Sequence, residues 1–273
     1  MTLETIDRRG LVLLGCGKMG TAMLEGWLSR GISPASVTVI DPYPSARLEA
    51  LQEEGLRLNA ELPQDPAICI LAVKPQMMSD ALPQISDLAR GGTIFLSIAA
   101  GTPISYFEDM IGRRAVIVRA MPNTPAAVGR GITAIVGNAA AGADALDMAD
   151  ELLRAVGQTV RLDNEGQMDG VTALSGSGPA YVFHMIEAMA AAGAEVGLPA
   201  ELSMKLARAT VGGAGALAEE ADETPDQLRV NVTSKGGTTA AALDVLMNEE
   251  TGLKQLMARA IRAAADRSKE LGQ

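Results

Sequence analysis

The chain contains few of the residues on which several classes of protein depend. Of its 273 residues, one is a histidine, two are cysteines and only 3% are aromatic. A single histidine excludes a histidine-based metal cluster, and so few aromatic rings leave no stacking platform for single-stranded nucleic acid. Cys16 and Cys69 lack metal-ligand spacing and indicate free thiols in a reducing compartment. We therefore expect no metal site.

Positive charge and long apolar runs are also scarce. The 33 acidic residues outnumber the 23 basic ones, which gives a net charge of −10. A chain this acidic, without a basic run, is unsuited to binding nucleic acid or an anionic membrane. No apolar stretch is long enough to span a membrane, and residues 1–10 carry charges of both signs, unlike a signal peptide. We expect a cytoplasmic protein with no nucleic-acid and no membrane partner.

A glycine-rich turn gives the first positive signal. Residues 11–14, Leu-Val-Leu-Leu, predict a buried strand, and Gly-Cys-Gly-Lys-Met-Gly follows as a turn into a helix that Gly31 ends. Gly15 permits the turn, Gly17 lets the backbone approach a pyrophosphate, and Gly20 lets helix and strand pack closely. The pyrophosphate is expected on the free amides at the positive end of the helix. Such turns also occur without a ligand, so the flanking strand and helix carry the dinucleotide hypothesis.

An acidic residue follows at the distance that this hypothesis requires. The predicted strand 37–40 ends at Asp41, 21 residues after Gly20 (41 minus 20), close to the roughly 20 expected for a ribose-binding residue. A carboxylate there accepts hydrogen bonds from ribose hydroxyls and repels a 2′-phosphate, which favours NADH. The alternative is that Asp41 only starts an Asp-Pro turn. Arg47 is a second group that could meet a phosphate, so both cofactors stay open.

Strands and helices alternate through residues 1–163. The continuous apolar runs that suit strands of a parallel sheet are residues 67–73, 93–98 and 115–119. Two further strands are predicted at 132–136 and 159–162, with a helix at 143–156 between them. This alternation predicts an α/β fold with an N-terminal Rossmann-type, doubly wound sheet. The segments that follow strand ends, where such sheets bind ligands, are Lys74, 99–101 and 121–123.

Residues 164–273 change character and predict an all-helical second domain. Prolines near predicted starts and glycines at ends delimit helices over 179–196, 199–220, 222–232, 240–247 and 248–271. Alanine and glycine crowd residues 188–197, which allows helices to approach closely. Those small residues pack either within one chain or, as we expect, in an obligate dimer.

Two loops in this arrangement carry chemistry. In residues 119–125 two prolines bracket Asn123, whose amide offers both a donor and an acceptor to a nicotinamide carboxamide. The alternative is a rigid turn in which the Asn123 side chain bonds its own backbone. Residues 232–239, Val-Thr-Ser-Lys-Gly-Gly-Thr-Thr, place hydroxyls and glycines at a helix start, which suits a carboxylate or phosphate. The alternative is an ordinary capped helix after a Gly-Gly turn.

Taken together, these segments resemble the pyrroline-5-carboxylate reductase family along nearly the whole chain. The segments that carry the resemblance are residues 15–20, 72–75, 119–125, 128–129, 173–181 and 232–239. The last two are the most specific, because other Rossmann enzymes lack them. The resemblance implies reduction of 1-pyrroline-5-carboxylate to L-proline by NADPH or NADH, the last step of proline biosynthesis. It also implies an interlocked homodimer whose cleft is built from both chains, and further assembly, commonly into decamers.

The resemblance further implies roles for individual residues. The substrate carboxylate is expected on Ser234, Gly237, Thr238 and Thr239, with Thr239 nearest the ring nitrogen as the catalytic residue. The expected cofactor-binding residues are Gly15, Gly17, Lys18, Met19, Gly20, Asp41, Ala72, Val73, Lys74, Pro75 and Asn123. Two positions depart from the family: Lys235 replaces a usual proline, which implies a looser loop, and Asp41 differs from Ser- or Arg-containing phosphate sites.

The chemistry implied needs little from the protein beyond orientation. A protonated cyclic imine is electrophilic enough to accept hydride, so we predict no catalytic base, and His184 is expected to be a packed or solvated helical residue rather than a proton donor. A β-hydroxyacid dehydrogenase would need a base, typically a lysine one turn into the helix after 176–178, and residues 179–185 contain none. A non-catalytic dinucleotide sensor would show a damaged substrate loop, of which Lys235 is the only hint.

Overall fold

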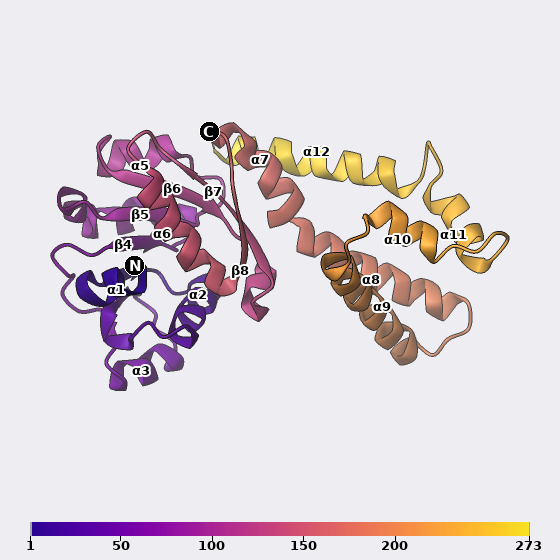
Figure 1. The fold of residues 1–273 in the computed structure, drawn as a ribbon, viewed down its shortest axis with the longest axis horizontal. Coiled ribbons are helices and arrows are strands. Elements are labelled where there is room, and N and C mark those ends of the chain that lie inside the picture. The colour runs from indigo at the N-terminus through magenta and orange to yellow at the C-terminus, as the bar shows by residue number, and fades with distance from the viewer. Residues whose placement is uncertain (1, 273) are drawn as a thin grey trace. The chain divides into compact units, whose positions relative to one another are not determined.

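A single sheet forms the centre of the first of two compact units in the computed structural model, which describes residues 2–272 (Figure 1). Within those residues eight strands pair in the order β3-β2-β1-β4-β5-β6-β7-β8. Their bounds are β1 Leu11–Leu14, β2 Val37–Ile40, β3 Arg57–Leu58, β4 Ile68–Leu71, β5 Ile94–Ser97, β6 Val116–Met121, β7 Gly131–Gly137 and β8 Gly157–Arg161. The doubly wound α/β fold predicted from the sequence is confirmed.

The centre of the sheet is β1, which pairs parallel to β2 on one side and to β4 on the other. Chain order reverses at this point, because β2 and β3 lie on one side and β4 to β6 on the other. Every residue of β1 and β4 is buried, as their uninterrupted apolar sequences predict. A crevice at the carboxyl ends of the strands beside β1 is where an open α/β sheet binds its ligand.

One pairing departs from the parallel pattern. β7 runs antiparallel to β6, with Val118 opposite Gly137 and Met121 opposite Ala134. The connection between them, residues 122–130, is too short for the crossover of a dozen or more residues that a parallel neighbour needs. The antiparallel return keeps the loop around Asn123 at the same end of the sheet as the glycine-rich turn.

Helices cover both faces of the sheet. Those of the first unit are α1 Thr2–Arg9, α2 Lys18–Ser29, α3 Ala46–Glu53, α4 Met78–Ala81, α5 Ile104–Ile111, α6 Ala143–Leu153 and α7 Met168–Val171. Alternate residues of β1 enter opposite cores: Leu11 and Leu13 pack in the cluster that contains Trp27 of α2, and Val12 and Leu14 in the cluster that contains Phe107 of α5. The buried Trp27 indole donates to the backbone oxygen of Leu152 over 3.0 Å, so its polar N–H is satisfied.

The second unit, residues 177–264, is helical throughout its regular structure. Its helices are α8 Gly178–Glu195, α9 Ala200–Glu220, α10 Pro225–Asn231, α11 Thr238–Leu246 and the greater part of α12 Leu253–Leu271. These confirm the predicted helices, with α10 beginning three residues later than expected (225 minus 222) and one larger difference, in that α12 begins five residues later (253 minus 248). The reason is a local turn, in which the Asn248 side-chain oxygen accepts from the amides of Glu250 and Thr251 and so competes with helix formation.

This unit has almost no core of its own. Among its described residues only Ala190, Ser203, Ala207 and Gly252 are buried. Large apolar side chains are exposed instead, for example Phe183 at 59%. A helical unit is stabilised mainly by burying an apolar face, and an exposed apolar surface of this kind is typical of a protein–protein contact.

The last turns of α12, from Ala265 on, belong to the first compact unit. There Ser268 Oγ donates to Asp169 Oδ1 over 2.7 Å, and a side chain at Gly101 would lie 3.3 Å from Leu271 Cβ. The compact units therefore divide after Gly176 and again before Ala265. A functional boundary between residues 163 and 164 stays a prediction.

Candidate active site

The glycine turn after β1 is built as the sequence predicts. Gly15 has φ +84°, and a side chain there would lie 2.7 Å from Val73 Cγ1 and 3.1 Å from the Ala72 carbonyl carbon. A side chain at Gly20 would lie 2.9 Å from the Gly15 oxygen. Both glycines are therefore required by close backbone packing, between β1, the end of β4 and the start of α2.

Gly17 differs, because nothing lies within 4 Å of the position that its side chain would take. It is exposed, and it is the N-cap of α2 in an extended conformation. The amides of Lys18, Met19 and Gly20 follow in the first turn, where an α-helix supplies no carbonyl partners. The turn thus leaves an open approach to N–H groups at the positive end of a helix, and the exposed Lys18 adds a cation.

Asp41 lies against this turn. Its Oδ2 accepts from the Cys16 amide over 2.6 Å, and its Oδ1 accepts from the Tyr43 amide over 2.8 Å. A carboxylate has about four lone-pair sites, so both oxygens keep capacity for a further donor. The turn interpretation of Asp41 is therefore correct as far as Tyr43 is concerned, and the ribose interpretation stays a prediction that this geometry permits.

Sequence reasoning missed the residue that holds Asp41 in place. The Asn59 side chain pairs with the backbone of Asp41, accepting from its N–H over 2.9 Å and donating to its carbonyl over 2.8 Å. Asn59 has φ +48°, a left-handed conformation that asparagine tolerates. Only its position after β3 in the folded sheet reveals this role.

The segment Ala72–Pro75 lines the other side of the turn. The Ala72 amide donates to the Leu14 carbonyl over 2.8 Å, which extends the pairing of β1 and β4 by one step. Val73 packs against Gly15, while Lys74 and Pro75 are exposed. These residues lie where a wall beside the ligand was expected, and their contact with a nicotinamide ribose stays a prediction.

The Asn123 amide is already engaged at both ends. Its Oδ1 accepts from the Ile132 amide over 2.9 Å, and its Nδ2 donates to the backbone oxygen of Ser175 over 3.3 Å. The side chain thus joins the start of β7 to residue 175, as a rigid loop requires. A bond to a nicotinamide carboxamide stays a prediction, and it would use the remaining capacity of these atoms.

A partly buried ion pair near this edge was also missed. Arg119 of β6, only 6% exposed, donates to Glu165 Oε1 over 2.6 Å. The same carboxylate oxygen accepts from the Ile104 amide over 2.8 Å and so caps α5. An arginine inside an apolar strand is the signal for such a partner, because an unpaired buried charge is strongly unfavourable.

In the second unit, residues 234–237 form a tight turn before α11. The Gly237 amide donates to the Ser234 carbonyl over 3.0 Å, and Gly236 has φ +72°. Thr233 Oγ1 donates to the Arg229 carbonyl over 2.6 Å, which fixes the turn to the end of α10. Gly237 is the N-cap of α11, so the first-turn amides of Thr238 and Thr239 lie at its positive end. The arrangement suits an anion.

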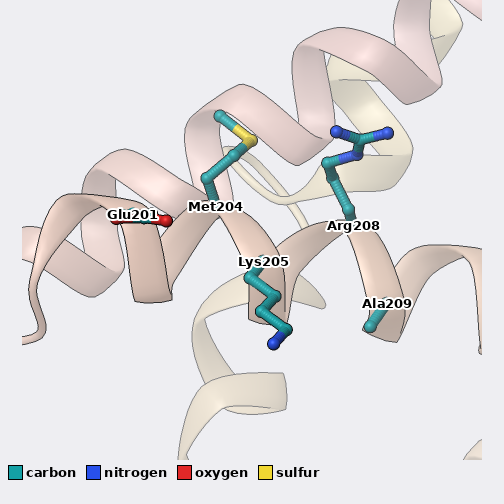
Figure 2. Close-up of a pocket in the computed structure, with 5 residues that line it drawn as sticks. All are labelled: Glu201, Met204, Lys205, Arg208 and Ala209. Atoms are coloured by element: carbon teal, nitrogen blue, oxygen red, sulfur yellow. The ribbon is translucent and has the colours of Figure 1, made fainter.

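Other features of the second unit do not form a chemical site. The hollow in Figure 2, about 580 Å³, is lined by Glu201, Met204, Lys205, Arg208 and Ala209, all on α9. Residues of one helix at this spacing share one side of it, which suits contact with another protein surface. His184 is exposed and lies 3.2 Å from Glu187 on the same helix, as expected for a solvated residue.

Both cysteines are free and buried. Burial raises the pKa of the Cys16 thiol, and burial raises the pKa of Cys69 further. Neutral buried thiols are inert, so neither residue is a nucleophile at neutral pH.

Comparison with known proteins decides the family. A pyrroline-5-carboxylate reductase from Synechocystis is 40% identical over 269 residues, covering 96% of this chain and 98% of that one. The enzyme of the same name from Pseudomonas aeruginosa is 35% identical, covering 96% and 97%. The chain belongs to the pyrroline-5-carboxylate reductase family.

Family models and solved structures agree with this assignment. The model for pyrroline-5-carboxylate reductase dimerisation matches residues 165–271, and that for F420-dependent NADP oxidoreductases matches residues 10–101. The Coxiella burnetii pyrroline-5-carboxylate reductase superimposes with a TM-score of 0.90 at 32% identity, covering 97% of this chain and 99% of that one. The Plasmodium falciparum enzyme, solved with NADP bound, gives 0.83 at 29% identity, covering 98% and 99%. Across residues 2–272 no helix is long and apolar enough to cross a membrane.

Proposed function

We propose that this protein reduces 1-pyrroline-5-carboxylate to L-proline, the last step of proline biosynthesis, with NADH or NADPH as reductant. The observation that carries the proposal is the open glycine turn between β1 and α2, in a chain that matches reductases of this name over 96% of its length. The helix start at Thr238 is the second support, because the substrate carries a carboxylate.

The residues around the turn fit a dinucleotide. The empty space beside Gly17 admits a pyrophosphate to the first-turn amides of α2, and Lys18 adds charge. Asp41 reaches the ribose with its remaining lone pairs, while Val73, Lys74 and Pro75 flank the nicotinamide end. When bound, the nicotinamide cofactor supplies the hydride.

The turn at 234–237 and the start of α11 hold the substrate. Ser234, Gly237, Thr238 and Thr239 offer hydroxyl and amide donors to the carboxylate, with the helix dipole in the favourable sense. The Thr239 hydroxyl lies nearest the ring nitrogen and keeps the protonated imine in place while its carbon accepts hydride. The nitrogen already bears its proton, so the product amine forms without a catalytic acid to supply one.

Orientation is then the main contribution of the protein. Holding two reactants in a reactive geometry lowers the barrier by roughly 7–11 kcal/mol. A β-hydroxyacid dehydrogenase remains disfavoured, because α8 carries no lysine in its first two turns. A dinucleotide sensor is disfavoured because the turn at 234–237 is intact.

The working form is an interlocked homodimer with a cleft built from both chains, and these dimers assemble further into decamers. Exposed apolar residues of the second unit, such as Phe183, Leu206 and Leu217, supply the contact surface. The two free thiols fit a cytoplasmic location. Residues 1–163 serve as the dinucleotide-binding domain and residues 164–273 as the substrate and dimerisation domain.

The experiment that tests this proposal measures the loss of nicotinamide absorbance after 1-pyrroline-5-carboxylate is added to the protein with NADH or with NADPH. Turnover that yields proline supports the proposal. A folded protein that binds cofactor yet oxidises none in the presence of this imine would instead be a sensor or a reductase of another imine.

A further inference from the structure

A cluster of three charged residues lies beside the predicted cofactor site. Arg47 donates to both carboxylate oxygens of Glu25, with Nε to Oε1 at 2.6 Å and Nη2 to Oε2 at 3.1 Å. A second carboxylate, that of Glu54, lies 3.6 Å from Arg47 Nη1. The guanidinium is thus held in a two-point fork by one acid and flanked by another, a geometry that fixes its orientation although all three side chains are partly exposed.

The position of Arg47 in the chain relates this ion pair to cofactor binding. β2 ends next to the glycine turn, where the Asp41 carboxylate bonds the Cys16 amide. Arg47 is the first cation after Asp41 and lies in the first turn of α3, the helix that follows β2. It is therefore the first basic side chain after Asp41 that could meet a phosphate on the adenosine ribose. Glu25 is on α2, the helix that begins at the same glycine turn.

The pair is stable at neutral pH. The hydrogen bond from Arg47 holds the pKa of Glu25 below its usual range. Because Glu25 stays ionised, the guanidinium keeps its partner throughout the range in which nicotinamide enzymes work. A 2′-phosphate entering beside Asp41 would meet one carboxylate directly and a cation already neutralised by two others.

We propose that Glu25 is a specificity-determining residue: by holding Arg47 it denies a cation to the 2′-phosphate of NADPH, and the protein selects NADH. The inference rests on the proposed function only in that a nicotinamide cofactor binds at the glycine turn. Glu25 does not itself contact the cofactor, and it affects cofactor choice only by engaging the Arg47 guanidinium.

The experiment measures Kd for NADH and for NADPH by nicotinamide fluorescence, with the whole chain and no substrate. The variants are Glu25→Gln, Arg47→Ala and the double variant. The matched control is Asp147→Asn, which breaks a similar surface pair with Arg161, 2.6 Å apart, on α6 and β8. Thermal melting of each variant checks that the fold is retained.

We expect the wild type to bind NADH at least about tenfold more tightly than NADPH. Glu25→Gln should tighten NADPH binding about tenfold, the order of one charge-assisted hydrogen bond, and leave NADH unchanged. Adding Arg47→Ala should remove that gain, and Asp147→Asn should change neither constant.

An unaltered NADPH constant in a folded Glu25→Gln variant would overturn the inference. The inference would also be overturned if the wild type preferred NADPH and Arg47→Ala abolished that preference. Arg47 would then bind the 2′-phosphate even while it is paired with Glu25. Binding of neither cofactor would overturn this inference and the proposed function together, whereas cofactor selection without imine turnover would remove only the proposed reaction.

Discussion

The carboxylate of Asp41 accepts a hydrogen bond from the amide of Cys16, with 2.6 Å between Oδ2 and N. The end of β2 is thereby tied to the glycine turn that follows β1. One acid at this point shapes the turn and, in the function proposed above, also sets the charge that an adenosine ribose would meet.

Replacing Asp41 with serine should shift cofactor use towards NADPH. The change removes a negative charge from the position that a 2′-phosphate would approach, so the NADPH to NADH ratio of kcat/KM should rise about tenfold. Initial rates with each cofactor at fixed imine concentration measure it. An unchanged ratio would mean that Asp41 acts only through its bonds to Cys16 and Tyr43.

Two glycine substitutions in the turn should have different effects. Gly15→Ala should destabilise the protein by about 1–2 kcal/mol or more, because φ is +84° and the new methyl would meet Val73 and the Ala72 backbone. A fall in Tm of several degrees is the readout. Gly17→Ala is the matched variant: its φ of −70° and open surroundings should lower Tm less than Gly15→Ala does, by no more than an N-cap exchange costs, while the methyl obstructs the pyrophosphate and weakens cofactor binding. Equal melting temperatures for the two variants would contradict this account.

Thr239→Ala should reduce kcat/KM for the imine by about tenfold or more and leave the cofactor Kd nearly unchanged. The loss reflects a hydroxyl that orients the ring nitrogen, worth on the order of 1–2 kcal/mol. Thr239→Ser keeps the hydroxyl and should restore most of the activity. Weaker cofactor binding in Thr239→Ala would show that the loop has been assigned to the wrong ligand.

Lys235→Pro should stabilise the protein by about 0.4–1 kcal/mol. The bond between residues 237 and 234 and the positive φ of Gly236 match a type II turn, in which proline is common at the position of Lys235. Turnover should be retained, because Ser234 and Thr239 keep their places. Lys235→Ala separates the loss of charge from the gain in rigidity. A lower Tm for the proline variant would show that Lys235 does not have a proline-like φ.

The local features of this protein follow from its sequence. Four apolar residues before Gly15 make a buried strand, and the spacing of Gly15, Gly17 and Gly20 makes a turn into a helix, because each step depends on neighbours in the chain. Pro179 lies in the first turn of its helix for the same reason, and Ser45 caps α3 through its own hydroxyl. The continuous apolar runs likewise predict the central strands, since burial on both faces leaves no polar positions.

Contacts between distant segments were decided only by the tertiary structure. The direction of β7 depends on a short return from β6, and the partners of Asp41 and Asn123 lie at residues 16, 132 and 175. The pairing of Arg47 with Glu25 joins residues 22 positions apart on two helices. No local pattern encodes such pairs, because the bonds exist only once the sheet has brought the ends of its strands together. The sequence therefore determined which groups are available for chemistry, and the fold decided which of them are already occupied by one another.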